Sequence, residues 1–61
     1  MSSKEIIKIL KKNGWYFVAS NGSHFHYKHA IILGKVTVPH QRKDIDIKTL
    51  ESISKHSGIK F

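Results

Sequence analysis

The sequence predicts an α+β domain with the element order α-β-β-β-α, in which a three-stranded antiparallel sheet carries both helices on one face. Two stretches, residues 3–12 and 47–57, repeat apolar residues at helical spacing, and the segment between them is rich in aromatic and β-branched residues. Strands grouped together with a helix at each end are typical of an antiparallel sheet that is covered on one side. With 61 residues the chain is long enough for one domain, which we expect to span residues 1–61.

Both predicted helices have recognisable starts. Ser2 and Glu5 fit a capping box, in which the serine side chain accepts a hydrogen bond from a backbone N–H and the glutamate reaches back to the serine backbone. Asp46 is a suitable N-cap for the second helix. We expect the basic side chains of the first helix only to keep its exposed face soluble; these are Lys4, Lys8, Lys11 and Lys12.

The strands are predicted from short runs bounded by turn residues. Asn21-Gly22 predicts a tight hairpin between the first two strands, because a type I′ turn needs positive φ at both central positions. Pro39 closes the third strand, since proline cannot donate to a ladder. The three predicted strands cover residues 15–20, about 23–29, and 35–38.

The composition narrows the possible partners. Eleven lysines and arginines against four acidic residues give a formal charge of +7, which attracts polyanions such as nucleic acid or an acidic protein. No apolar run approaches the roughly 20 residues of a membrane-spanning helix, and the first residues lack a secretory signal pattern. The chain has no cysteine, so disulfides and thiolate metal sites are excluded. We therefore expect a cytoplasmic protein without a cofactor.

The second predicted strand separates two kinds of side chain onto two faces. Phe25 and Tyr27 share one face, which should meet the helices, and His24, His26 and Lys28 then share the open face. Two imidazoles and an ammonium group on a solvated surface are poorly explained by packing. They suit a ligand that carries phosphate groups.

The hairpin between the second and third strands bears on the chemistry. If His29 pairs with Lys35 around a five-residue loop, His24 falls opposite His40 where the sheet ends. Two neighbouring imidazoles would provide the general base and the general acid that RNA cleavage by 2′-hydroxyl attack requires. This register depends on the loop length, which the sequence does not determine.

A metal site is the alternative interpretation of the histidines. Strand alternation argues against it, because His29 points to the opposite face from His24 and His26. Two imidazoles without a carboxylate or thiolate nearby make a poor zinc site. We expect no metal.

Several segments of the chain together form a recognisable pattern. The most specific is Gly22-Ser23-His24 at the start of the second strand. The others form a looser pattern: Ile9-Leu10-Lys11-Lys12-Asn13-Gly14-Trp15, Val36-Thr37-Val38-Pro39, Thr49-Leu50-Glu51-Ser52-Ile53 and Gly58-Ile59. Through these segments the chain resembles, over almost its whole length, the HicA family of bacterial toxins.

The resemblance implies a minimal double-stranded-RNA-binding fold that cleaves mRNA without a metal. It also implies a HicB-type antitoxin that binds and silences the toxin, and complexes assembled through that antitoxin. The catalytic histidine of the family maps onto His24. The chain departs from the family in two places. Ala30-Ile31-Ile32-Leu33 is apolar where family members usually have polar turn residues, and His40 follows Pro39 directly instead of lying two places after it. The apolar turn suggests an interaction surface or a longer strand pair.

Five further residues are expected to contact RNA. Lys28 is placed to hold a phosphate or to stabilise charge that develops on phosphorus, and Arg42 and Lys43 precede a helix N-terminus that can meet backbone phosphates. The remaining two are His26 and His40. The sequence leaves the general acid open among His26, Lys28, His40 and water.

Two other functions fit the same residues. A non-catalytic double-stranded-RNA-binding module needs the basic groups but not His24. A protein-interaction domain would use the apolar 30–33 turn, with the charge incidental. Steep salt dependence of RNA binding distinguishes the first from the second, because phosphate contacts release counterions.

Overall fold

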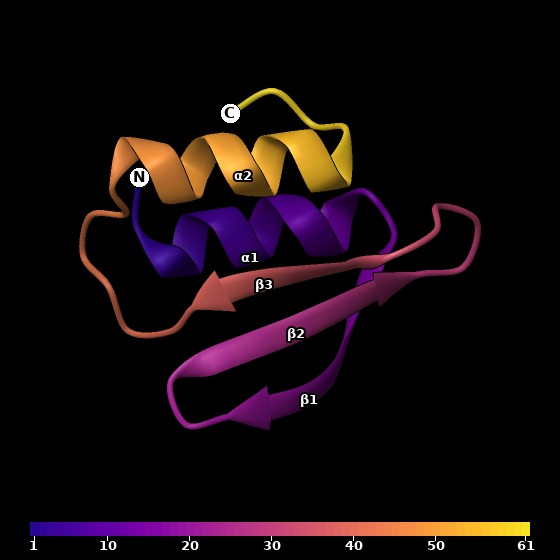
Figure 1. Cartoon of the computed structure of the whole chain (residues 1–61), viewed down its shortest axis with the longest axis horizontal. Coiled ribbons are helices and arrows are strands. Elements are labelled where there is room, and N and C mark those ends of the chain that lie inside the picture. The colour runs from indigo at the N-terminus through magenta and orange to yellow at the C-terminus, as the bar shows by residue number, and fades with distance from the viewer.

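The computed structural model describes all 61 residues and has the predicted element order (Figure 1). The elements are α1 (Ser3–Lys12), β1 (Trp15–Asn21), β2 (His24–His29), β3 (Lys35–Pro39) and α2 (Ile47–Ser57). The strands form one antiparallel sheet in the order β1-β2-β3, which confirms the α+β fold class. Neither helix has the length and apolar character needed to cross a bilayer.

The ends of both helices follow the predicted capping chemistry. The Ser2 side chain accepts from the Glu5 N–H, and the Glu5 carboxylate accepts from the Ser2 N–H, which completes the capping box. Asp46 caps α2 by accepting from the backbone N–H of Thr49, and Gly58 ends α2 in the left-handed conformation at φ 75°. Local sequence therefore defines where each helix starts.

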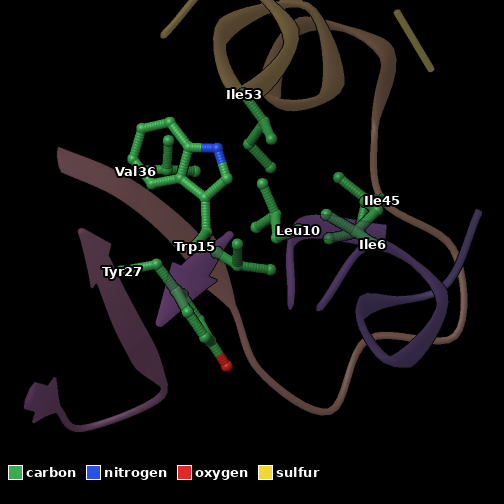
Figure 2. Packing of buried hydrophobic residues seen from close by; sticks show 8 residues of the cluster. Ile6, Leu10, Trp15, Tyr27, Val36, Ile45 and Ile53 are labelled. Atoms are coloured by element: carbon green, nitrogen blue, oxygen red, sulfur yellow. The ribbon is translucent and has the colours of Figure 1, made fainter. Parts of the chain in front are cut away.

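Both helices pack on the same face of the sheet, and the core lies between these two layers (Figure 1). Figure 2 shows side chains from both helices and all strands pointing into this cluster. The buried members are Ile6, Leu10, Trp15, Tyr27, Val36, Val38, Ile45 and Ile53. Because the core is confined to one face of the sheet, the other face is left open.

The pairing of β2 with β3 differs from the expected register by one residue. Tyr27 lies opposite Val36 and Phe25 lies opposite Val38. In the expected register Tyr27 would face Thr37, and the two valines would point away from the helices. A shift of one residue moves every side chain of a strand to the other face, so burial of the valines decides the register. The expected register was wrong because it was set from loop length alone.

The turn between β1 and β2 also differs from the prediction. Asn21 pairs with His24, so Gly22 and Ser23 are the two central residues instead of Asn21 and Gly22. Only Gly22 has a positive φ, 63°, which is the pattern of a type II′ turn with glycine at its first central position. The predicted type I′ turn was wrong, although the hairpin itself is confirmed.

A β-bulge interrupts the pairing of β1 with β2. Phe17 lies opposite Tyr27 and Ala19 lies opposite His26, which leaves Val18 as the extra residue. The Phe17 ring contacts the rings of Phe25 and Tyr27, with centroids 5.2 and 5.9 Å away, yet its residue is still 47% exposed. Phe17 therefore covers the edge of the core and is not part of its interior.

Candidate active site

The open face of the sheet carries the predicted row of side chains along β2. His24 and Lys28 are exposed and His26 is half-buried, whereas Tyr27 is buried against the helices and Phe25 packs at the edge of the core. The alternation of β2 thus places the imidazoles and the ammonium group on the face that the helices do not cover. This confirms the predicted division of the strand.

His24 lies at one end of the sheet, where β2 begins and both neighbouring strands, β1 and β3, end. It pairs with Asn21 of β1 and with Pro39 of β3, directly after the Gly22-Ser23 turn. Its imidazole makes no hydrogen bond within the chain, whereas the rings of His26, His29 and His56 each make at least one. Both ring nitrogens of an exposed imidazole are then available to a ligand.

His26 is held in place by a residue that the sequence analysis did not single out. Its Nδ1 lies 2.9 Å from the hydroxyl of Thr37, which is opposite it on β3. Only Nε2 of His26 is left free for a ligand. The sequence signal for Thr37 was the register of β2 and β3, which places the two side chains on the same face.

Lys28 shares the face of His24 but lies at the other end of β2. Lys28 is four positions along the strand from His24, which corresponds to about 13 Å at about 3.3 Å per residue. Lys28 pairs with Tyr16 of β1 and with Lys35 of β3. The side chains of His24 and Lys28 therefore lie near opposite ends of the open face of β2.

The expected meeting of His24 and His40 does not occur. His24 lies opposite Pro39, and the His40 N–H donates to the Ser23 carbonyl at 2.6 Å. The His40 ring stacks on Phe25 with centroids 4.0 Å apart and planes 13° from parallel. His40 thus joins the side of the sheet that faces the helices, because the one-residue change of register reverses its face. The predicted pair of imidazoles was wrong.

The loop after β3 is fastened to the start of α1 by one serine. The Ser3 hydroxyl donates to the Pro39 carbonyl and accepts from the Arg42 N–H at 3.0 Å. The Ser3 N–H also donates to the Arg42 carbonyl at 2.9 Å. These bonds bring the first turn of α1 beside residues 40–43.

A basic hollow of about 420 Å³ results from this arrangement. No carboxylate lines it. Lys4 is the member that sequence reasoning assigned to solubility alone, because its proximity to the loop exists only in the folded chain. The lining residues are Ser2, Ser3, Lys4, His40, Gln41, Arg42 and Lys43.

Two acidic residues, Asp44 and Asp46, follow the loop that forms this hollow. Asp44 pairs with the N-terminal ammonium group of Met1 at 3.0 Å. Hydrogen bonds from the side chain and the backbone of Thr49 hold the pKa of Asp46 below its ordinary value of 3.8. The charge of Asp44 is thus offset by the N-terminal ammonium group, whereas Asp46 is held in its ionised form and its charge offsets part of that of Arg42. The hollow remains basic because three cationic side chains line it, those of Lys4, Arg42 and Lys43.

His29 is separated from the other two histidines of β2. Its ring lies edge-on to Trp15, with centroids 5.2 Å apart, and its Nε2 donates to the Asn13 carbonyl at 3.0 Å. No group of three histidine and acidic side chains lies close enough to bind a metal ion together.

Fold and surface together define a small, strongly basic α-β-β-β-α domain with a free histidine on the open face of its sheet. A family model described as the HicA toxin of bacterial toxin–antitoxin systems matches residues 3–59. The chain therefore belongs to the HicA toxin family, as the sequence resemblance suggested. A search of curated proteins found no match.

Proposed function

We propose that this HicA-family chain is a metal-independent endoribonuclease that cleaves mRNA, with His24 as its catalytic residue. The observation that carries the proposal is the His24 imidazole, which is exposed, free of hydrogen bonds and located at the end of the open face. An imidazole can accept or donate a proton at neutral pH. Positioned proton transfer contributes typically about 10² to 10⁴ in rate.

The proposed reaction needs no group beyond the RNA and the protein. Nε2 or Nδ1 of neutral His24 takes the proton of a ribose 2′-hydroxyl while that oxygen attacks the adjacent phosphorus. The bond from phosphorus to the 5′-oxygen breaks, and the leaving oxygen receives a proton. The products are a 2′,3′-cyclic phosphate and a 5′-hydroxyl end.

His26 is the proposed source of the second proton. It is the nearest imidazole on the same face, two residues and about 7 Å along the strand from His24. Its Nδ1 is bonded to Thr37, so Nε2 is the ring nitrogen left to supply the proton. His40 fits this role less well because its ring lies on the helix side of the sheet, stacked on Phe25. Lys28 fits it less well because it lies near the far end of β2.

RNA is held, in this proposal, by phosphate contacts on either side of His24. On one side, the basic hollow supplies Lys4, Arg42 and Lys43, together with His40. This hollow follows Pro39, the last residue of β3, which is paired with His24. Lys28 contacts a phosphate toward the opposite end of the open face. Contacts of this kind fix the position of the RNA but do not read its sequence.

The proposed partner is a HicB-type antitoxin, and the proposed site of action is the cytoplasm. An antitoxin that covers the open face would block His24 directly. An acidic surface on it would suit the net charge of +7 and would speed association. The oligomeric state of the toxin is then set by complexes with the antitoxin.

Expression in bacteria tests the proposal. The wild-type chain should stop growth and degrade mRNA, and the His24→Ala variant should be harmless while its circular dichroism spectrum remains native. His56→Ala is the matched control, because His56 is an exposed histidine on α2, away from the open face. Equal toxicity of the wild type and His24→Ala would refute catalysis by His24.

A non-catalytic double-stranded-RNA-binding module is the second candidate, and the basic hollow favours it because phosphate binding there does not need His24. In that case RNA binding survives His24→Ala, and purified wild-type protein leaves RNA intact.

A further inference from the structure

The loop between β2 and β3 exposes large apolar side chains that the proposed function does not use. Ile31 is 85% exposed and Leu33 is 93% exposed, with Ile32 between them also exposed. Single exposed apolar residues are ordinary, whereas a contiguous exposed apolar patch is typical of an interaction site. Figure 1 shows this loop extending past the ends of both helices. We call residues 30–33 the apolar tip.

The apolar tip is held in a defined shape by His29. Nδ1 of His29 accepts from the N–H groups of Ile31 and Ile32, at 3.1 and 3.2 Å. Because Nδ1 is the acceptor, the ring proton is on Nε2, which donates to Asn13 at the end of α1. The loop backbone is thus tied to α1 through one imidazole, and its ordering cost on binding is reduced in advance.

The surroundings of the apolar tip are positively charged. A hollow of about 400 Å³ at its base is lined by Ile32, Leu33, Gly34 and His29 together with Lys28 and Lys35. The two lysines lie directly opposite each other across β2 and β3. The single ion pair of the chain is at its N-terminus, so neither ammonium group has a carboxylate partner.

We propose that the apolar tip is a docking site for the antitoxin, through a segment that combines apolar side chains with carboxylates. The apolar side chains would fill the hollow, and the carboxylates would pair with Lys28 and Lys35. A second copy of this chain fits poorly, because it would bring two more lysines and another +7 charge to the same place. The proposal rests on the proposed function in that the partner is the antitoxin.

Docking at the apolar tip is separable from catalysis. His24 and His29 are the two ends of β2, so His24 lies about 17 Å, at about 3.3 Å per residue, from His29, which directly precedes the tip. The apolar tip therefore acts as an anchor, while another part of the antitoxin covers the active site. Variants of the tip should remain toxic and lose neutralisation.

The test uses the double variant Ile31→Ser/Leu33→Ser and the antitoxin encoded with this toxin, purified separately. Its affinity for the full-length toxin, measured by calorimetry, should fall at least about tenfold, as loss of an interface anchor does. Co-expressed antitoxin should then no longer restore growth. Ile47→Ser is the matched control, since Ile47 is 70% exposed but lies at the start of α2, and it should bind like the wild type.

Charge is tested with Lys35→Glu, which should weaken binding and reduce its dependence on salt. Unchanged affinity and full neutralisation of the double variant would overturn the proposal. Light scattering gives a second way to overturn it. If the wild-type toxin is a dimer and the double variant is a monomer, a second copy of the chain occupies the apolar tip. Binding is measured without RNA, so lack of nuclease activity would refute the proposed function and leave this result standing.

Discussion

Removal of the Ser3 hydroxyl tests how the loop that carries the basic hollow is held. Ser3 is 2% exposed, and its hydroxyl makes two hydrogen bonds, to the Pro39 carbonyl and from the Arg42 N–H. At about 1 kcal/mol for each bond, Ser3→Ala should lower the free energy of unfolding by about 2 kcal/mol. The higher helix propensity of alanine returns at most about 0.5 kcal/mol of this.

For a domain of 61 residues, each 1 kcal/mol corresponds to about 4–8 °C in Tm, so Ser3→Ala should lower the Tm by about 6–16 °C. Thermal unfolding followed by circular dichroism measures this. Ser20→Ala is the matched control, because Ser20 is exposed on the edge strand β1. The variant should also bind RNA more weakly, since the loop bearing Arg42 and Lys43 loses its attachment to α1. A Tm within about 2 °C of the wild type would refute this account of the loop.

Three further predictions concern local features of the structure. Gly14→Ala should destabilise the fold by at least about 1 kcal/mol in urea unfolding, because a Cβ at φ +91° would lie 2.8 Å from Nε2 of His29. Hydrogen bonds at the start of α2 lower the pKa of Asp46 below 3.8, so its stabilising effect is present above that pH and is lost as the pH falls further. The urea midpoints of the wild type and Asp46→Asn should therefore differ at pH 6 and converge in strong acid. Lys4→Ala should weaken RNA binding and reduce the salt slope by about 1, whereas Lys8→Ala, on the exposed face of α1, should leave both unchanged.

Local sequence was sufficient to predict the elements and the division of β2 into two faces. The capping box at Ser2 and Glu5, and the N-cap at Asp46, depend only on residues within a few positions, and the structure confirms them. The position of His24 on the open face followed from strand alternation together with the need to bury Tyr27.

The predictions that were wrong, the register of β2 with β3 and the meeting of His24 with His40, depended on contacts between distant segments. The register of β2 and β3 is decided by which residues of β3 can enter the core, and Val36 and Val38 both do. Applying this burial criterion to the sequence would have corrected the register and moved His40 away from His24. Loop length was a weaker criterion because the chain accommodates one residue more in the hairpin.

The role of Lys4 shows a second limit. Nothing in its own helix distinguishes it from Lys8, and its place in the basic hollow arises from bonds between Ser3 and the loop after β3. The bonds from His29 to the apolar tip are likewise invisible to periodicity, because they join a strand end to a loop. Side chains that fasten loops are found from a structure and not from patterns.

The ends of the RNA products test the central claim most directly. Purified protein is incubated with an RNA oligonucleotide in the presence of EDTA, and the products are analysed by mass spectrometry beside His24→Ala and a fully 2′-O-methylated RNA. We predict 2′,3′-cyclic phosphate and 5′-hydroxyl ends, no cleavage of the methylated RNA, and a rate about 10² to 10⁴ lower for His24→Ala. Recovery of 3′-hydroxyl and 5′-phosphate ends, or cleavage of the methylated RNA, would contradict the proposed mechanism.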